Sequence, residues 1–317
     1  MKKWLSVLIF LLLTTGCKTS VGKIPVDIPT AGTTGALYPL GASLAYVWNR
    51  EIDEIKASSQ SSNGGIENLN LIYEGEADVS LGVTSIVYQA FNGTDKFEGR
   101  QNQKLRIITG LYYNPNQIVV SNKSKIQSLQ ELKGHSFAPG SPGSTTEDET
   151  KIHFDAFGMD YPQDIDAVYI GPSEASDLIR NRSLDGLWVM AGVPTASVNE
   201  LITTADCHLL PISKEEVDIL KEKYPWYASY TIPADTYKNQ SEDIETSAIK
   251  MVLYTTTDMD EEVVYQLTKT FWENIEELKS TNKSLSSVTI EDAVTDISNL
   301  PLHKGSEKYY REIGLIP

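Results

Sequence analysis

Residues 249–256 read Ile-Lys-Met-Val-Leu-Tyr-Thr-Thr, an apolar, strand-forming run late in a chain of 317 residues. A second such run, Gln-Ile-Val-Val-Ser, occupies residues 117–121. Both compositions are typical of buried strands. We expect the chain to cross from a first lobe to a second along residues 117–121 and to return along residues 249–256. A cleft between the lobes is then the natural place for a small ligand, with the crossing strands as its hinge.

The rest of the chain alternates between strand-like and helix-like segments, which predicts an α/β protein with parallel sheets. The clearest helical pattern covers residues 261–279, where apolar side chains recur at three- and four-residue steps, and residues 126–133 also look helical. The remaining strand candidates are residues 24–29, 78–83, 105–112, 136–139, 167–170 and 186–190. The predicted division is residues 24–120 for the first lobe, 121–248 for the second and 249–317 for the return.

The first residues have the layout of an export signal over residues 1–16. Lys2 and Lys3 precede an apolar stretch at residues 4–13, which is too short to span a bilayer, and small residues lead to Cys17. A cysteine after Thr-Gly resembles a bacterial lipobox, so we expect Cys17 to carry lipid and to anchor the protein to a membrane outside the cytoplasm. Simple secretion is the alternative. With Cys17 lipidated, Cys207 has no intrachain partner.

The charge of the chain excludes one class of partner. The formal net charge is −16, and removing Lys2 and Lys3 with the signal makes it about −18. Nucleic acid is therefore not expected as a partner. An acidic surface on an exported protein is more often a matter of solubility than of function.

Two loops rich in glycine and hydroxyl side chains suggest a clamp for a ligand. They are residues 32–41, Gly-Thr-Thr-Gly-Ala-Leu-Tyr-Pro-Leu-Gly, and residues 140–147, Gly-Ser-Pro-Gly-Ser-Thr-Thr-Glu. Each precedes a predicted helix, where backbone N–H groups hold an anion cheaply. The alternatives are ordinary loops and, for Tyr38, a buried structural tyrosine. The predicted ligand-binding residues in these loops are Gly32, Thr33, Thr34, Tyr38, Ser144, Thr145 and Thr146.

Five further residues are candidates for the same cleft. Ser62, Asn63 and Gly64 come just before a helix-like segment, where Ser62 or Asn63 could cap the helix and still face a ligand. Thr84 follows an apolar strand, at the end where open α/β sheets bind ligands, and Gly192 follows another. The competing interpretation is a solvated turn for the first three residues and a helix cap for Thr84.

Catalytic and cofactor motifs do not accompany these loops. The sequence has no Gly-x-Ser-x-Gly elbow, no His-Glu-x-x-His, no phosphate-binding Gly-x-x-x-x-Gly-Lys-Ser/Thr and no Cys-x-x-Cys. Glu149 and His153 share one helical face at metal-ligand spacing, but the sequence offers no third ligand. We therefore expect capture of a small molecule without catalysis, metal or cofactor.

Several segments in order resemble the TAXI family of TRAP-transporter solute-binding proteins. They are residues 32–41, residues 63–69 (Asn-Gly-Gly-Ile-Glu-Asn-Leu), residues 75–78 (Gly-Glu-Ala-Asp), residues 129–134 (Leu-Gln-Glu-Leu-Lys-Gly), residues 143–147, residues 185–194 and residues 301–306 (Pro-Leu-His-Lys-Gly-Ser). The resemblance implies a two-lobed, periplasmic-binding-protein-like (type II) fold. It further implies a receptor that closes on a carboxylate, such as a glutamate-like amino acid or a dicarboxylate, and delivers it to a TRAP-type membrane permease.

Two other functions are compatible with the same residues. One is a ligand-sensing lipoprotein that presents its closed form to a signalling partner. The other is an enzyme built on a similar two-lobed scaffold, which would require a cofactor and a product. A neighbouring gene for a multi-spanning permease would favour the receptor over the sensor.

Overall fold

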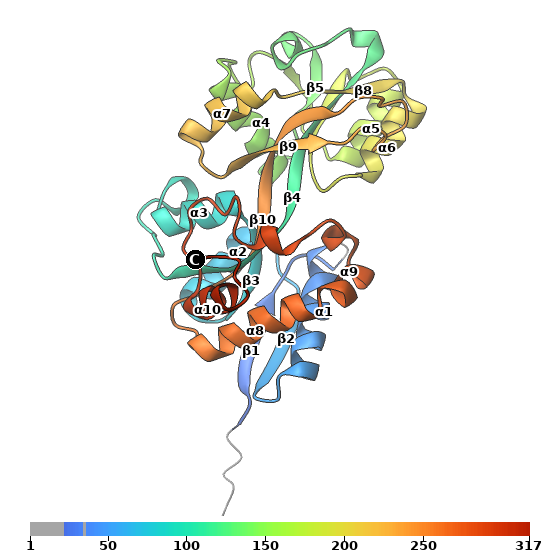
Figure 1. Ribbon diagram of the computed structural model, residues 1–317. Helices are drawn as coiled ribbons and strands as arrows, with labels where there is room; N and C mark the ends of the chain where they lie inside the picture. Colours follow the sequence, from blue (N-terminus) through green and yellow to red (C-terminus); the bar gives the residue numbers. More distant parts are fainter. Residues whose placement is uncertain (1–21, 34–35) are drawn as a thin grey trace, which may run out of the picture.

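The structure is a computed structural model that describes residues 22–33 and 36–317. Two lobes are stacked and are joined by two long strands, β4 (Leu105–Ser121) and β10 (Ile244–Thr256), which run through both (Figure 1). Each strand is apolar enough to be buried almost throughout its length. The two strands therefore form both the core of the connection and its hinge.

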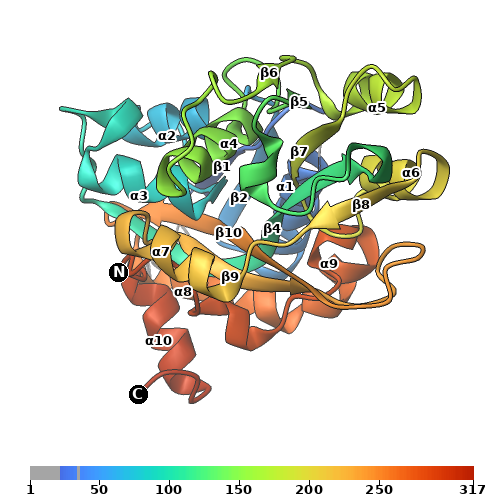
Figure 2. The same ribbon diagram turned by 90° about the horizontal axis from the view of Figure 1, so that it is seen from above.

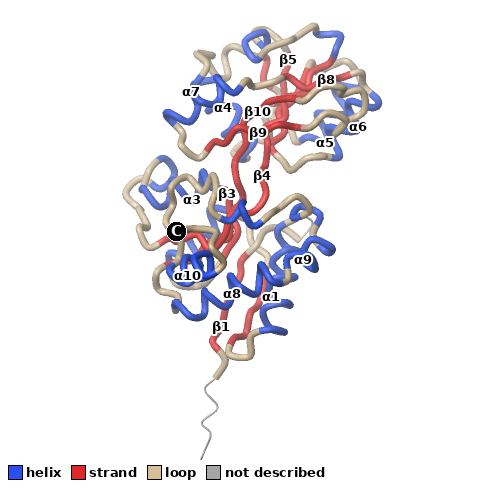
Figure 3. The backbone as a smooth tube through the Cα atoms, in the orientation of Figure 1, coloured by secondary structure: helices blue, strands red, loops and turns tan. Residues whose placement is uncertain are grey.

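Lobe 1 combines the N-terminal part of the chain with its C-terminal return (Figure 3). A parallel pair of strands, β1 and β2, lies beside α1, and β3 pairs with β10. The N-terminal elements are β1 (Ile24–Pro29), α1 (Leu37–Glu51), β2 (Ile55–Gln60), α2 (Gly65–Glu74), β3 (Ser80–Val83), α3 (Thr84–Asn92) and the 3-10 turn η1 (Asp95–Phe97). The returning elements are α8 (Glu261–Glu273), α9 (Ile275–Thr281), η4 (Lys283–Leu285), η5 (Ile290–Ala293) and α10 (Lys304–Glu312).

Lobe 2 is formed by the continuous middle of the chain. Its strands are β5 (Ser136–Ala138), β6 (Asp166–Ala167), β7 (Gly186–Met190), β8 (Cys207–Leu210) and β9 (Tyr227–Ile232). Its helices are α4 (Thr145–Ala156), α5 (Pro172–Arg180), α6 (Ala196–Thr204) and α7 (Lys214–Lys223), with the 3-10 turns η2 (Asn122–Ser124) and η3 (Leu129–Leu132).

The larger sheet runs through both lobes in the order β3-β10-β4-β7-β5-β6, with β8 also on β4 and β9 also on β10. On β4, residues up to Pro115 pair with β10, whereas residues from Asn116 onward pair with β7 and β8. This change of partner lies a few residues before the predicted lobe division at residue 120. The expectation of parallel sheets was wrong in part. The sheet is mixed, because β10 runs antiparallel to β3, β4 and β9 on its way back.

Other predicted elements differ locally from the structure. The helix predicted over residues 261–279 is two helices, because Asn274 leaves the helical conformation between α8 and α9. The helical expectation for residues 126–133 was wrong, since only η3 forms there. Among the described residues, no helix is both long and apolar enough to cross a bilayer. The predicted signal peptide and Cys17 lie outside the described residues.

Candidate ligand-binding cleft

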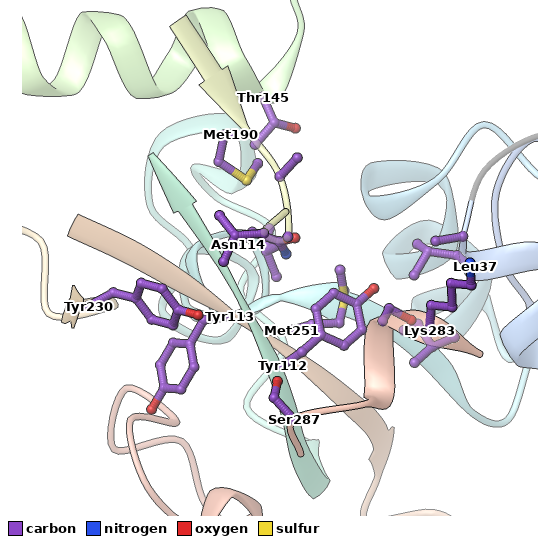
Figure 4. Close-up of a pocket in the computed structure, with 18 of the residues that line it drawn as sticks. Leu37, Tyr112, Tyr113, Asn114, Thr145, Met190, Tyr230, Met251, Lys283 and Ser287 are labelled. Atoms are coloured by element: carbon purple, nitrogen blue, oxygen red, sulfur yellow. The ribbon is translucent and has the colours of Figure 1, made fainter. Parts of the chain in front are cut away.

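A cavity of about 880 Å³ lies where the two lobes face each other (Figure 4). This volume is in the upper part of the range for small-molecule sites. Lobe 1 and the hinge contribute Ala36, Leu37, Gly65, Leu81, Gly82, Val83, Ile86, Tyr112, Tyr113, Asn114, Met251, Lys283, Ser284, Ser286 and Ser287. Lobe 2 contributes Thr145, Met190, Ala191, Gly192, Val193, Pro194 and Tyr230.

Helix N-termini from both lobes border the cavity. On lobe 1, α1 begins at Leu37 and α2 begins at Gly65, and neither start has a capping side chain within the described residues. Gly64, the N-cap of α2, has φ +91°, a backbone conformation that favours glycine. On lobe 2, α4 begins at Thr145 and is capped, because Ser144 Oγ accepts a hydrogen bond from the N–H of Glu147 at 3.2 Å. A second helix of lobe 2, α6, begins at Ala196 just after the lining residue Pro194 and has no capping side chain, so uncapped helix starts occur on both lobes.

Both predicted clamp loops reach this cavity. Thr145, from the second loop, lines it directly, as do Ala36 and Leu37 from the first loop. Gly192 also lines it. Thr34 lies outside the described residues.

The remaining predicted residues of the two loops do not line the cavity. Gly32 and Thr33 are exposed in the loop after β1, and Tyr38 is a partly buried residue in the first turn of α1. Ser144 and Thr146 flank Thr145 at the start of α4. Their assignment as ligand contacts stays a prediction.

The predicted cap of α2 was wrong. Gly64 occupies the N-cap position, and the Ser62 hydroxyl instead donates to Asn68 Oδ1 at 2.6 Å while it accepts from the Gly64 N–H. The backbone N–H of Asn63 donates to Glu67 at 2.9 Å. Thr84 is fully buried at the start of α3, and its hydroxyl donates a long bond to the carbonyl of Trp226 at 3.5 Å. Ser62, Asn63, Gly64 and Thr84 are not among the residues that line the cavity.

Sequence reasoning missed the hinge residues Tyr112, Tyr113 and Asn114. The predicted strands at residues 105–112 and 117–121 left residues 113–116 outside any strand, but β4 is continuous through them. Asn114 is only 8% exposed and lines the cavity, and its side-chain amide has no hydrogen-bond partner among the described residues. Its amide atoms are not among the fully buried unpaired atoms, so they are open to the cavity and available to a ligand.

The two hinge tyrosines differ in their partners. Burial raises the pKa of Tyr112 to about 12, which keeps its hydroxyl protonated and able to donate. The Tyr113 hydroxyl donates to Asp296 at 2.6 Å, away from the cleft, and burial raises its pKa further. Tyr113 therefore presents mainly its ring to the cavity, 5.7 Å from the ring of Tyr230.

A buried lysine fixes the C-terminal return to the hinge. The Lys250 ammonium donates to the Thr295 carbonyl at 2.9 Å and lies 3.3 Å from Asp292. It also lies 4.6 Å from the centre of the Tyr113 ring. Burial lowers the pKa of Lys250, while Asp292 opposes that shift. This arrangement ties the segment that follows η4 to both crossing strands.

A buried polar network joins α4 to the hinge in lobe 2. The Glu149 carboxylate accepts from the Asn116 amide at 2.8 Å and from the Tyr227 hydroxyl at 2.9 Å. Burial raises the Glu149 pKa to about 7. His153, whose pKa burial lowers to about 4, uses one ring nitrogen on the Glu149 carbonyl and the other on Ser247, each at 2.7 Å. The considered Glu149–His153 metal pair is thus occupied by protein partners, and the described residues contain no metal-ligating cluster.

A direct contact closes one side of the cleft between the lobes. Lys96, in η1 of lobe 1, forms an ion pair with Asp148, in α4 of lobe 2. Nearby, the rings of Tyr88 and Trp226 lie 5.5 Å apart across the same boundary. Figure 2 shows α3 and α4 on this same side of the molecule. A side cavity of about 200 Å³ lies there and shares Ile86 and Thr145 with the main cleft.

We expect Lys96→Met to shift the unliganded protein toward an open arrangement. The ion pair is partly exposed, so its loss should change the open-to-closed ratio by no more than about fivefold. Small-angle scattering at low salt should report a larger radius of gyration than for the unchanged protein. The matched control is Lys104→Met, which removes an exposed ion pair with Asp258 within lobe 1. Equal radii for all three proteins would show that the Lys96 pair does not hold the lobes together.

The fold is shared with several solved two-lobed binding proteins at low sequence identity. The periplasmic aliphatic sulphonate binding protein SsuA from Escherichia coli matches with a TM-score of 0.50 and 13% identity, covering 91% of this chain and 87% of that one. A periplasmic sulfonate-binding SsuA from Methylobacillus flagellatus matches at 0.53 and 12%, covering 93% and 89%. PhnD1 from Prochlorococcus marinus, in complex with methylphosphonate, matches at 0.53 and 11%, covering 92% and 99%.

These matches establish the fold as the two-lobed periplasmic-binding-protein type with a cleft between the lobes. A family model describes nearly the whole chain, from residue 28 to residue 314. The chain belongs to the NMT1-like family.

Proposed function

We propose that this protein is an extracytoplasmic solute-binding receptor that captures a small carboxylate-bearing ligand and delivers it to a TRAP-type membrane permease. The observation that carries the proposal is the cavity of about 880 Å³, lined by both lobes around two continuous hinge strands. Such an architecture binds by closing, and the closed form is what a membrane partner can recognise.

The chemistry of the cleft supports an anionic ligand. Lys283 is the only charged side chain among the described residues that line the cavity. The start of α1, which has neither a capping side chain nor an acidic residue in its first turn, adds partial positive charge on the same lobe, whereas Glu67 compensates the start of α2. Hydroxyl and amide groups of Asn114 and Thr145 can then orient the ligand by hydrogen bonds.

The TRAP permease rests on the resemblance of the sequence segments to the TAXI family, and the lipid anchor at Cys17 rests on the export-signal layout and its resemblance to a lipobox. A second candidate is a receptor for an organic sulfonate or phosphonate that serves an ABC-type permease. It is favoured by the neighbours in fold, which include sulfonate-binding SsuA proteins and a phosphonate-binding PhnD1.

A thermal-shift panel on the mature protein tests the proposal. Amino acids, mono- and dicarboxylates, sulfonates, phosphonates and sugars would each be added in excess. A ligand at about 100 times its dissociation constant stabilises the folded state by about 2.7 kcal/mol, which is readily measured. We expect carboxylates to raise the melting temperature. Shifts with sulfonates or phosphonates alone would favour the second candidate, and shifts with sugars alone would overturn both.

A further inference from the structure

Resting on the proposed function, we infer that the cleft selects organic anions that carry one negative charge and an extended apolar body, in preference to dicarboxylates. The charged group lies on the lobe 1 side near Lys283, and the apolar body lies across the hinge toward lobe 2. Four features of the cavity lead to this assignment.

The first feature is the uneven distribution of charge. Lobe 1 supplies Lys283 and the start of α1, which has no acidic residue in its first turn. Figure 4 draws Lys283 and Leu37 on the same side of the cavity. In lobe 2, the start of α4 carries its own carboxylates in Glu147 and Asp148. These carboxylates already compensate the positive end of α4, so a second negative charge on the ligand would gain little from that terminus.

The second feature is that the α4 terminus is already satisfied. Ser144 caps it, and the Glu147 carboxylate accepts from the Gly143 N–H at 2.6 Å. Lys151 lies 2.8 Å from the same carboxylate. By contrast, α1 has no capping side chain among the described residues. The lobe 2 loop therefore has fewer donors left for an anion than its sequence suggests.

The third feature is the apolar floor of the cavity, by which we mean the side chains of Leu81, Val83, Tyr112, Met190 and Met251. They come from β3, β4, β7 and β10, so the floor extends across both lobes. All but Met190 are at most 8% exposed. A carboxylate placed over this floor would lose its hydration without a cation to replace it.

The fourth feature is the unpaired amide of Asn114, which is more than nine-tenths buried and borders the cavity. It can pair with a neutral polar group of the ligand, but it carries no charge to neutralise a second anion. The central part of the cleft thus accepts neutral polar or apolar groups, and Lys283 is the only cationic side chain among the described lining residues.

Calorimetric titration with matched carboxylates tests this assignment. The probes are butyrate, hexanoate and octanoate against succinate, adipate and suberate, which have the same carbon counts but a second carboxylate. We expect the affinity of the monocarboxylates to rise by about fourfold for each added methylene until the cavity is filled. Each dicarboxylate should bind at least about tenfold more weakly than the monocarboxylate with the same number of carbons.

The position of the charge is tested with one variant and one control. Lys283→Met keeps an unbranched side chain, one atom shorter, and removes its charge, so hexanoate affinity should fall by about tenfold. Lys279→Met is the control, since Lys279 pairs with Glu276 outside the cavity lining. Equal losses of hexanoate affinity in Lys283→Met and Lys279→Met would show that the bound carboxylate does not lie near Lys283.

The remaining outcomes separate this inference from the proposed function. Dicarboxylates that bind as tightly as the monocarboxylates would overturn the single-charge assignment and leave the receptor function intact. Hexylamine binding as tightly as hexanoate would also overturn it, because the apolar floor alone would then explain binding. Failure of every carboxylate, sulfonate and phosphonate in the thermal-shift panel would instead overturn the anion receptor itself.

Discussion

Asn114→Asp is expected to reduce hexanoate affinity by about 100-fold or more at pH near 8. The substitution keeps the shape of the side chain and places a carboxylate at a site that is 8% exposed and borders the cavity. The ligand's apolar body would then cover an ionised carboxylate and remove its hydration without supplying a cation, which costs at least a few kcal/mol. Calorimetric titration of the unchanged and substituted proteins measures the loss.

Two companion variants separate charge from shape. Asn114→Leu removes the amide without adding charge, so its effect on hexanoate should stay within about tenfold. Asn239→Asp adds the same charge at an exposed turn of lobe 2 and should leave affinity unchanged. Near-equal affinities for the two Asn114 variants would mean that this residue does not face the bound ligand.

Glu149→Gln should stabilise the unliganded protein by about 3 kcal/mol at pH near 8. The Glu149 side chain is buried, and folding raises its pKa from the ordinary 4.5 to about 7. The folded state thus holds this proton more tightly than the unfolded chain. The corresponding stability is complete below pH 4.5 and is lost as the pH rises through 7. Glutamine remains neutral and can still accept from Asn116 and Tyr227.

Denaturant unfolding at several pH values between about 5 and 8 measures this effect. The unchanged protein should lose stability relative to Glu149→Gln across that interval. Its neighbour Glu147 provides a control of opposite sign. Burial raises the pKa of Glu147, but Lys151 and the Gly143 N–H together outweigh burial and lower it. Glu147→Gln should therefore destabilise the protein near pH 8, and a gain in stability from both variants would contradict this account.

Glu149 also lies close to the region where the two lobes meet. Glu149 lies in the second turn of α4, whose first residue borders the cleft, and it is bonded to Asn116 on β4 and Tyr227 on β9. The network therefore connects the lobe 2 wall of the cleft to the hinge. Asp148 and Lys96, which pair across the lobes, line the same side cavity as Glu149.

Local sequence patterns predicted several elements closely. Residues 24–29 and 186–190 form β1 and β7 with the predicted bounds, and the helical pattern at residues 261–279 corresponds to α8 and α9. The alternation of strands and helices also predicted the α/β class. These signals succeed because they depend on burial of one face of a single element.

The missed strands and the mixed sheet depend on more distant partners. β2, β8 and β9 are short or polar, and their strand conformation is stabilised by pairing with β1, β4 and β10. The direction of β10 relative to β4 is set by the path of the intervening lobe, which no local pattern records. The 17-residue strand β4 was predicted as two separate strands. Pro115 lies in the gap between them, and proline is uncommon in a central strand.

The candidate cleft was anticipated only in part. Thr145 and Gly192 carry a recognisable glycine and hydroxyl pattern and do line the cavity. Lys283 and the serines around it lie in a turn without a distinctive sequence, and they reach the cleft only because the C-terminal return folds back beside the hinge. Asn114 was hidden by the apparent strand break. Residues that join a site through tertiary structure alone leave little local signal.

Because lobe 1 is built from two separate stretches of the chain, we expect it to fold after lobe 2. Lobe 2 is a single uninterrupted stretch, so its strands can pair as soon as that stretch is available. Lobe 1 must wait, because β3 pairs with β10 about 170 positions later in the chain. The turn that holds Lys283 comes later still. A folding intermediate with an ordered lobe 2 should therefore precede any species able to retain an anion, and stopped-flow refolding should show ligand binding as the last phase.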